Sequence, residues 1–275
     1  MDAEAFFNGV DARSRRVETP CGDGHMVWRI WGQGAPLVFI HGGAGAWSHW
    51  IRNIPEFEGG RMVIAPDLPG LGESASPPKP YTPESIAKIA ADGLHHLLPP
   101  GAQFDMVGFS FGGMISGLMA SLHGARVRTL TLMGPSGLGG QFGNIRPPVR
   151  LPQGGTQEEL AAAHRHNLAA IMLHDPAKID DLAMHVQAIN APRTRVLSPE
   201  HAMSEKLLNA LREIPARVCS IWGEFDISSP HLQHRRDVIA DVHPSAEFYI
   251  IPGAGHWVQY EAADETNALL RKFIA

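Results

Sequence analysis

The sequence predicts an α/β fold, in which a mostly parallel central sheet is flanked by helices. The first observation is alternation, because short β-rich runs are separated by longer stretches with helical periodicity. The second is that several short runs are apolar throughout, such as LVFI at 37–40 and MVIA at 62–65. Strands that are buried on both faces have this composition, which favours a parallel sheet covered by helices.

The individual elements follow from these patterns. Strands are expected over residues 26–31, 36–40, 61–65, 103–108, 128–133, 217–222 and 246–251. Helices are expected over residues 83–98, 111–123, 198–212, 231–240 and 261–274. Alternation of this kind implies right-handed crossovers between neighbouring parallel strands.

The segment 138–198 interrupts the alternation because it contains no convincing strand. It opens with LGGQFGNIRPPVRLPQGG and continues with helical stretches near 157–173 and 176–189. Ligands of open α/β sheets bind outside the carboxyl ends of the strands. We therefore expect one domain over 1–275 in which about 138–198 forms an inserted helical lid. The alternative is a helical subdomain without a role in the site.

Composition limits the kind of protein. The 275 residues are 44% hydrophobic and 19% charged, as in globular proteins, and the net charge is 23 − 28 = −5. A mildly acidic chain without a basic stripe disfavours nucleic acid or an anionic membrane as a partner. No apolar run reaches about 18 residues, and the N-terminus lacks the apolar core of a secretory signal. Cys21 and Cys219 are expected to be reduced in a cytoplasmic protein.

The strongest chemical signal is the pentapeptide 108–112, GFSFG, between an expected strand and an expected helix. This is the context of a nucleophile elbow, a strand-to-helix turn so tight that small residues flank the serine. The turn presents the hydroxyl of Ser110 above the sheet, near backbone N–H groups at a helix N-terminus that favour negative charge. The structural alternative is a glycine-rich helix start capped by a serine.

A nucleophilic serine needs a base that is itself oriented by an acid. Asp226 in WGEFD follows the expected strand 217–222, and His256 in PGAGH follows the expected strand 246–251. The order serine, acid, base is the one that this strand-to-helix arrangement uses. Glu224 competes for the role of the acid, but it lies closer to the strand, so we expect its side chain to turn away.

The loop HGGAGA at 41–46 directly follows the expected strand 36–40. Acyl transfer creates an oxyanion, and one preorganised N–H donor stabilises it by about 3–4 kcal/mol. We predict that the oxyanion hole is formed by the N–H groups of Phe111 and Gly43, with Ala44 as an alternative to Gly43. His41 is expected to bond within the loop.

Ala44, Phe109 and Trp257 are predicted to contact the substrate, with Met133 as a further candidate. Aromatic and apolar side chains around a nucleophile point to an apolar or aromatic acyl compound, although such residues are also ordinary core residues. No cofactor is expected, because the glycine-rich stretches lack G-x-G-x-x-G. No metal is expected either, because the histidines do not occur in an H-E-x-x-H pattern.

Five motifs in order, HGGAGA, APDLPGLGES, GFSFGG, WGEFD and GAGHW, resemble those of the α/β-hydrolase family over nearly the whole chain. The resemblance implies the α/β-hydrolase fold and a serine hydrolase. The tail GHWVQYE at 255–261 and the loop HGGAGAW are also similar to those of the meta-cleavage-product hydrolases. Those enzymes cleave a carbon–carbon bond in 2-hydroxy-6-oxo-dienoates.

Two departures weaken the closer resemblance. The elbow of those hydrolases usually carries Asn at the position of Phe109, and their lid carries an Arg that binds the substrate carboxylate. Here His185 and Gln187 lie near the expected place of that Arg, while Arg193 and Arg195 lie further on. A buried, unpaired carboxylate is costly, whereas a simple ester needs no such clamp.

The sequence therefore predicts a serine hydrolase of a small carboxylic ester or related acyl compound, including thioesters, lactones and amides. One alternative is carbon–carbon cleavage of a dienoate. The other is a small-molecule receptor of the same fold with little turnover. The expected partner is a small-molecule substrate. The sequence is compatible with a homo-oligomer as well as with a monomer.

Overall fold

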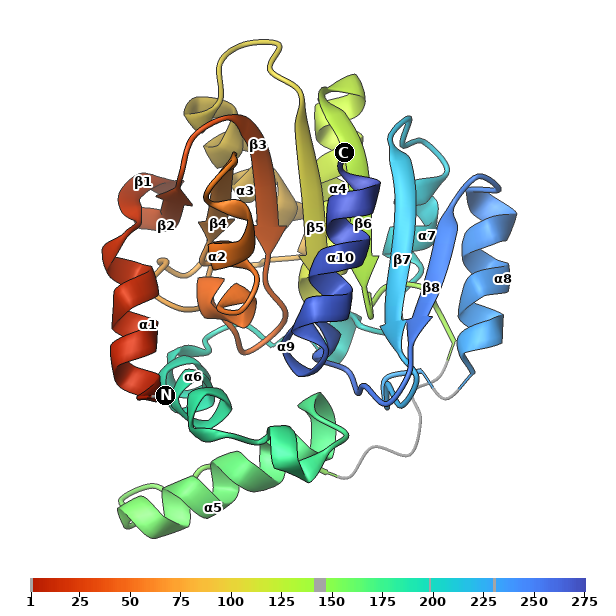
Figure 1. The fold of residues 1–275 in the computed structure, drawn as a ribbon. Helices are drawn as coiled ribbons and strands as arrows, with labels where there is room; N and C mark the ends of the chain where they lie inside the picture. Colours follow the sequence, from red (N-terminus) through yellow and green to blue (C-terminus); the bar gives the residue numbers. More distant parts are fainter. Residues whose placement is uncertain (1, 141–146, 198, 230) are drawn as a thin grey trace.

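An eight-stranded sheet forms the centre of the computed structural model, which describes residues 2–140, 147–197, 199–229 and 231–275 (Figure 1). The strands are β1 (Arg15–Cys21), β2 (Gly24–Trp31), β3 (Ala35–Ile40), β4 (Arg61–Pro66), β5 (Phe104–Phe109), β6 (Val127–Met133), β7 (Arg217–Gly223) and β8 (Glu247–Ile251). Their order is β1-β2-β4-β3-β5-β6-β7-β8. Only the pairs β1–β2 and β2–β4 are antiparallel, so the prediction of a mostly parallel sheet is confirmed.

Helices cover both faces of the sheet (Figure 1). They are α1 (Ala3–Ala12), α2 (Ile54–Phe57), α3 (Pro83–Leu97), α4 (Phe111–His123), α5 (Gln157–Asn167), α6 (Asp181–Asn190), α7 (Lys206–Leu211), α8 (Leu232–Val242), α9 (Val258–Glu261) and α10 (Ala263–Phe273). Residues of α3, α4, α7 and α8 share one buried apolar cluster, while α1, α2, α6, α9 and α10 share a second. The two clusters form the core because each face of the sheet buries its own set of apolar side chains.

Two elements at the N-terminus were not expected from the sequence, namely α1 and β1. The strand β1 alternates exposed and buried positions at the edge of the sheet, so its sequence RRVETPC is more polar than that of a central strand. The helix α1 is capped by Asp2, whose side chain accepts from the N–H of Ala5, and it buries Phe7 and Val10. The helix buries two of its ten residues, so its apolar pattern in the sequence is weak.

The helix expected over 198–212 is much shorter, because α7 begins only at Lys206. Ahead of it, the carbonyl oxygens of Ala202 and Ser204 accept from the N–H groups of Gly137 and Gly139. Backbone groups that pair with a neighbouring loop are not available for a helix. A tertiary contact thus overrides the local helical pattern.

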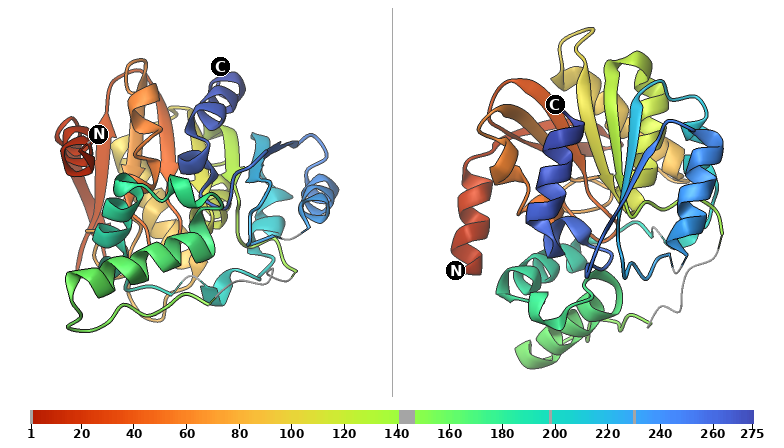
Figure 2. Two further views of the ribbon diagram at one scale, coloured as in Figure 1. Left: turned by 60° about the horizontal axis from the view of Figure 1, so that its bottom comes forward. Right: turned by 45° about the vertical axis from the view of Figure 1, so that its right-hand side comes forward.

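The helices α5 and α6 lie across the carboxyl ends of the strands, as the left view in Figure 2 shows. They belong to the segment 138–198, and a π-helical turn, η3 (Leu168–Met172), follows α5. Near its end, α6 is tied to the loop after β3 by hydrogen bonds between Asn190 and Ser48. The place of these helices is the one expected of a lid, and their role as a lid stays a prediction.

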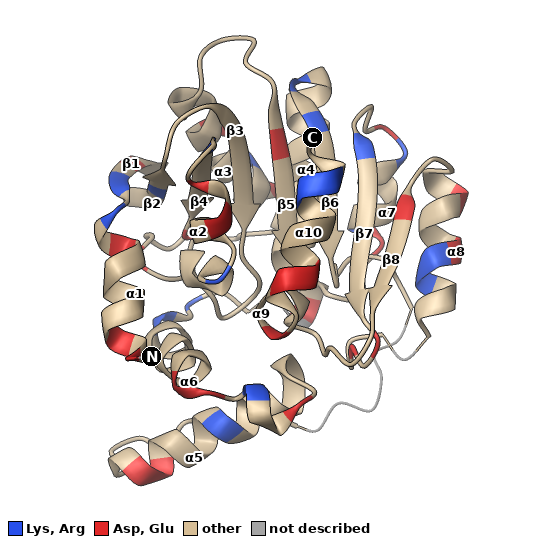
Figure 3. Ribbon diagram, viewed as in Figure 1, with Lys and Arg blue, Asp and Glu red and all other residues tan. Residues whose placement is uncertain are grey.

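The outer helices α5, α8 and α10 carry side chains of both charges (Figure 3). Both α5 and α10 begin with acidic residues and end with basic ones, which suits the dipole of a helix. Within the four described ranges, no helix has the length and apolar character needed to span a bilayer.

Acid is expected to destabilise the fold through His123 at the end of α4. Burial, followed by the nearby Arg126, lowers the pKa of His123 from 6.5 to about 4. Between about pH 4 and pH 6.5, His123 is therefore protonated in the unfolded chain but neutral in the folded chain. Stability should be complete above about pH 6.5 and fall toward pH 4, by at most about 1.4 kcal/mol per pH unit for this one group.

The measurement is the urea midpoint between pH 7 and pH 4 for the wild type and for His123→Gln. The variant should show a shallower decline, because it lacks this titrating group. Equal slopes in the two proteins would contradict the assignment. The buried residues His41, His49 and His164 also have lowered pKa values and contribute to the slope expected in the variant.

Candidate active site

Ser110 stands alone between β5 and α4, with φ +54° and ψ −120°. This backbone conformation is strained for a residue with a side chain. The flanking glycines make the turn possible. A Cβ atom on Gly112 would lie 2.1 Å from the carbonyl oxygen of His41, and one on Gly108 would lie 2.2 Å from Oγ of Ser116. The sequence G-x-S-x-G is therefore required here by close packing of the turn.

The structure brings Ser110, His256 and Asp226 together, although they lie far apart in the sequence. Oγ of Ser110 is 2.9 Å from Nε2 of His256, and Nδ1 of His256 is 2.9 Å from each carboxylate oxygen of Asp226. Because a carboxylate only accepts, Nδ1 carries the proton and Nε2 is free to accept from the serine. This is the arrangement in which a serine is activated for attack.

The carboxylate of Asp226 is buried and held by its own turn. Its Oδ1 accepts from the N–H of Ser228 at 2.9 Å and from Oγ of Ser228 at 2.6 Å. Glu224, the competing acid, points elsewhere and accepts from the N–H of Gly253 at 2.9 Å. The expectation that Glu224 turns away from the site is confirmed.

The predicted oxyanion donors lie on both sides of the serine. Phe111 is the first residue of α4, and Gly43 and Ala44 lie in the loop after β3. This loop is adjacent to the serine, because a Cβ atom on Gly42 would lie 3.2 Å from Cβ of Ser110. The N–H groups of Phe111 and Gly43 have no acceptor among the described residues. Both are thus available to a ligand, and their role in an oxyanion hole stays a prediction.

His41 holds the loop in place, as expected from the sequence. Its Nδ1 donates to the carbonyl of Gly42 at 2.7 Å, and its Nε2 accepts from the N–H of Leu68 at 2.8 Å. Burial lowers the pKa of His41, so the ring is neutral and both bonds are retained near neutral pH.

Phe109 and Trp257, predicted to contact substrate, are almost completely buried. The ring of Phe109 lies 4.9 Å from the ring of His256. Trp257 stacks on Tyr260 and donates from Nε1 to the carbonyl of His49 at 2.9 Å. Phe109 thus packs beside His256, Trp257 packs beside His49 and Tyr260, and Ala44 is exposed on the loop. Contact of these three residues with a substrate remains a prediction.

Two neighbours of the site were missed from the sequence. His49 is buried within 5.7 Å of the Phe109 ring and 5.2 Å of the Trp257 ring. Its pKa lies well below 6.5 because of burial, with His41 and His256 as further causes. Gly134, after β6, leaves room for the acid, since a Cβ atom there would lie 2.6 Å from Oδ2 of Asp226. In the sequence, His49 is marked only by its position after the motif HGGAGA, and Gly134 only by its position after a strand.

Cys21 and Cys219 are buried free thiols, and burial raises the pKa of Cys219 to about 12. Neither is suited to act as a nucleophile near neutral pH. Among the described residues, no three histidine, cysteine, aspartate or glutamate side chains gather in a metal-binding arrangement.

Comparison with known proteins agrees with the fold. Residues 37–269 match the model of the "Alpha/beta hydrolase family". The chain is 31% identical over 258 residues to the dihydrolipoyllysine-residue acetyltransferase component of the acetoin cleaving system of Pseudomonas putida, covering 88% of this chain but only 64% of that protein. It is 29% identical over 262 residues to 2-hydroxy-6-oxo-6-phenylhexa-2,4-dienoate hydrolase of Burkholderia cepacia, covering 89% of each.

Among solved structures, the esterase RhEst1 from Rhodococcus sp. ECU1013 superimposes with a TM-score of 0.78 at 19% identity. The match covers 95% of this chain and 98% of that one. At this identity the likeness shows the shared fold.

Proposed function

The chain belongs to the alpha/beta hydrolase family, and on that premise we propose that it hydrolyses a small carboxylic ester or related acyl compound through an acyl-enzyme. The observation that carries the proposal is the pair of 2.9 Å contacts that joins Ser110 to His256 and His256 to Asp226. The substrate is an apolar or aromatic acyl compound, in keeping with the aromatic ring of Phe109 beside His256.

The reaction proceeds in two halves. Oγ of Ser110 attacks the carbonyl carbon while Nε2 of His256 takes the hydroxyl proton, and the N–H groups of Phe111 and Gly43 stabilise the oxyanion. His256 returns the proton to the leaving alcohol as the ester bond breaks. A water molecule then attacks the acyl-enzyme with His256 again as the base, which releases the acid and restores Ser110. Asp226 stabilises the imidazolium in both halves.

Carbon–carbon cleavage of a dienoate is the second candidate, because several relatives at 27–31% identity are dienoate or semialdehyde hydrolases by name. A dienoate carries a carboxylate that needs a cationic partner when buried. The helix α6 contains no arginine. Arg195 donates to the carbonyl oxygens of Gly72 and Ser74, and Arg193 lies 3.5 Å from Glu73. Both side chains contact the loop 72–74, which favours the ester.

The two candidate reactions are distinguished by comparing kcat/KM for esters and for a dienoate. We expect the wild type to hydrolyse p-nitrophenyl esters of short acyl chains with a higher kcat/KM than it shows for 2-hydroxy-6-oxo-6-phenylhexa-2,4-dienoate. Arg193→Ala and Arg195→Ala should leave ester turnover within about threefold, since neither side chain clamps the substrate. A dienoate kcat/KM above that of every ester would reject the ester in favour of carbon–carbon cleavage.

A further inference from the structure

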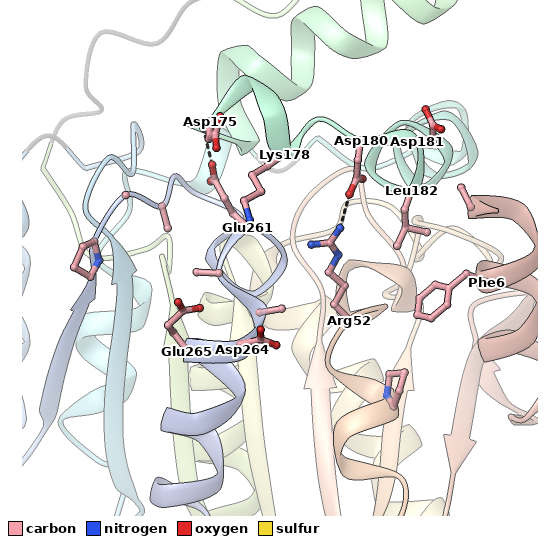
Figure 4. Close-up of a pocket in the computed structure, with 17 residues that line it drawn as sticks. Phe6, Arg52, Asp175, Lys178, Asp180, Asp181, Leu182, Glu261, Asp264 and Glu265 are labelled. Carbon is pink, nitrogen blue, oxygen red and sulfur yellow. Dashed lines mark hydrogen bonds and ion pairs between the residues drawn. The ribbon is translucent and has the colours of Figure 1, made fainter. Parts of the chain in front are cut away.

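The carboxylate of Glu261 lies at the end of α9 and is buried, yet it has no catalytic assignment. It accepts three backbone N–H groups: Oε2 accepts from Gly255 at 2.7 Å and from His174 at 3.1 Å, and Oε1 accepts from Asp175 at 2.7 Å. Figure 4 shows Glu261 beside Asp175 at the margin of a pocket of about 760 Å³. Hydrogen bonds to an ionised carboxylate are stronger than those between neutral groups. The three bonds therefore hold Glu261 strongly to the backbone of Gly255, His174 and Asp175.

The three bonds join two different parts of the chain. Gly255 directly precedes His256, whereas His174 and Asp175 belong to the segment 172–175, which connects η3 to the turn before α6. On the other side of His256, the N–H of Trp257 donates to the carbonyl of Met172 at 2.7 Å. The backbone on both sides of the base is thus attached to the segment 172–175, once directly and once through Glu261.

The same segment also reaches the acid. The ring of His174 stacks on the ring of Phe225, with centroids 3.8 Å apart and planes 14° apart. Phe225 directly precedes Asp226, and its N–H donates to the carbonyl of Ala254 at 2.9 Å. The loops that carry Asp226 and His256 are therefore bonded to each other and covered by one segment.

We propose that Glu261 is a positioning residue that sets the imidazole of His256 toward Ser110 by fixing the 255–257 backbone against the segment 172–175. The inference rests on the proposed function, in which His256 is the base. General-base catalysis depends on alignment, and a displacement of about 1 Å costs on the order of 100-fold in rate. The link also makes the segment 172–175, between the helices η3 and α6, part of the support of His256. Its placement then affects the nucleophile before any substrate is bound.

The test measures the reactivity of Ser110 without the natural substrate. The purified full chain is treated with an alkyl fluorophosphonate, which labels an activated serine with loss of fluoride, and with p-nitrophenyl acetate. We expect Glu261→Gln to lower the labelling rate constant and kcat by about 10- to 100-fold, with KM changed less than about threefold. Glu261→Ala should lose more, because glutamine keeps one accepting oxygen.

The matched control is Glu265→Gln, an exposed carboxylate beside the same pocket, and it should label like the wild type. The thermal unfolding midpoint of each variant is measured as well. It shows whether the variant is folded at the assay temperature, so that each labelling rate constant can be referred to folded protein. A purely structural Glu261 would lower the midpoint and leave the labelling rate of the folded protein unchanged, and that result overturns the inference. If Glu261→Gln does not fold, Glu261→Asp takes its place, and an unchanged rate in that variant overturns the inference equally.

Failure of the inference and failure of the proposed function give different results. A wild type that neither labels at Ser110 nor turns over p-nitrophenyl acetate speaks against the serine hydrolase itself. A wild type that labels at Ser110, with Glu261→Gln labelling at the same rate, leaves the hydrolase intact and removes the role of Glu261.

Discussion

Ser110→Ala is expected to lower ester turnover by about four to six orders of magnitude, since removing a catalytic serine forfeits the covalent step. The residual rate would come from the oxyanion donors and substrate binding alone. Alanine lacks only the hydroxyl group of serine and therefore introduces no new clash in the turn. We expect the variant to fold. The measurement is kcat with p-nitrophenyl acetate, together with mass spectrometry of the fluorophosphonate adduct on the peptide that contains residue 110.

The matched control is Ser121→Ala, in which an exposed serine near the other end of α4 is replaced. Its activity and labelling should equal those of the wild type. Adding His256→Ala to Ser110→Ala should cost little further rate, because residues that act as a unit lose their effect together. Retention of a tenth of the wild-type activity by Ser110→Ala would eliminate Ser110 as the nucleophile.

Asp226→Asn is expected to lower kcat by about four orders of magnitude while the fold is retained. The asparagine amide can donate to Nδ1 of His256, which favours the tautomer with the proton on Nε2. That tautomer cannot accept the proton of Ser110. The side chain also loses the charge that stabilises the imidazolium. Steady-state kinetics with the same ester checks the prediction.

Glu224→Gln provides the comparison, because it changes a carboxylate two residues away that bonds to Gly253 instead of the base. We expect kcat to decrease by less than about tenfold. The decrease would arise only from a weaker hydrogen bond to Gly253, in the loop that precedes His256. Should Glu224→Gln prove the more damaging of the two substitutions, the acid would have been assigned to the wrong carboxylate.

Much of the fold was predictable because its signals are local. Central strands such as β3 and β4 are buried over their last four residues, and those residues, LVFI and VIAP, are apolar. The turn at Ser110 needs glycines at fixed spacing, and the order of the motifs along the chain supplied Asp226 and His256 as candidates. The fold class and the family resemblance are confirmed by the sheet and by the family match.

Other features had no local signal. The edge strand β1 is polar on its open side, and α7 is shortened by bonds from Gly137 and Gly139 to the turn before it. The buried imidazole of His49 depends on the packing of Phe109 and Trp257, which come from distant parts of the chain. Such contacts form only when separate segments meet, and a single sequence does not record which segments meet.

The sequence by itself determined the alternating elements, the strained serine turn and the three residue types that a serine hydrolase needs. Hydrophobic periodicity and glycine spacing act over a few neighbouring residues and are therefore visible in the chain. The tertiary structure decided that Asp226 and not Glu224 faces His256, and that Glu261 joins the segment 172–175 to the loop that carries His256. These outcomes depend on the directions of side chains on separate loops, which packing of the whole chain sets.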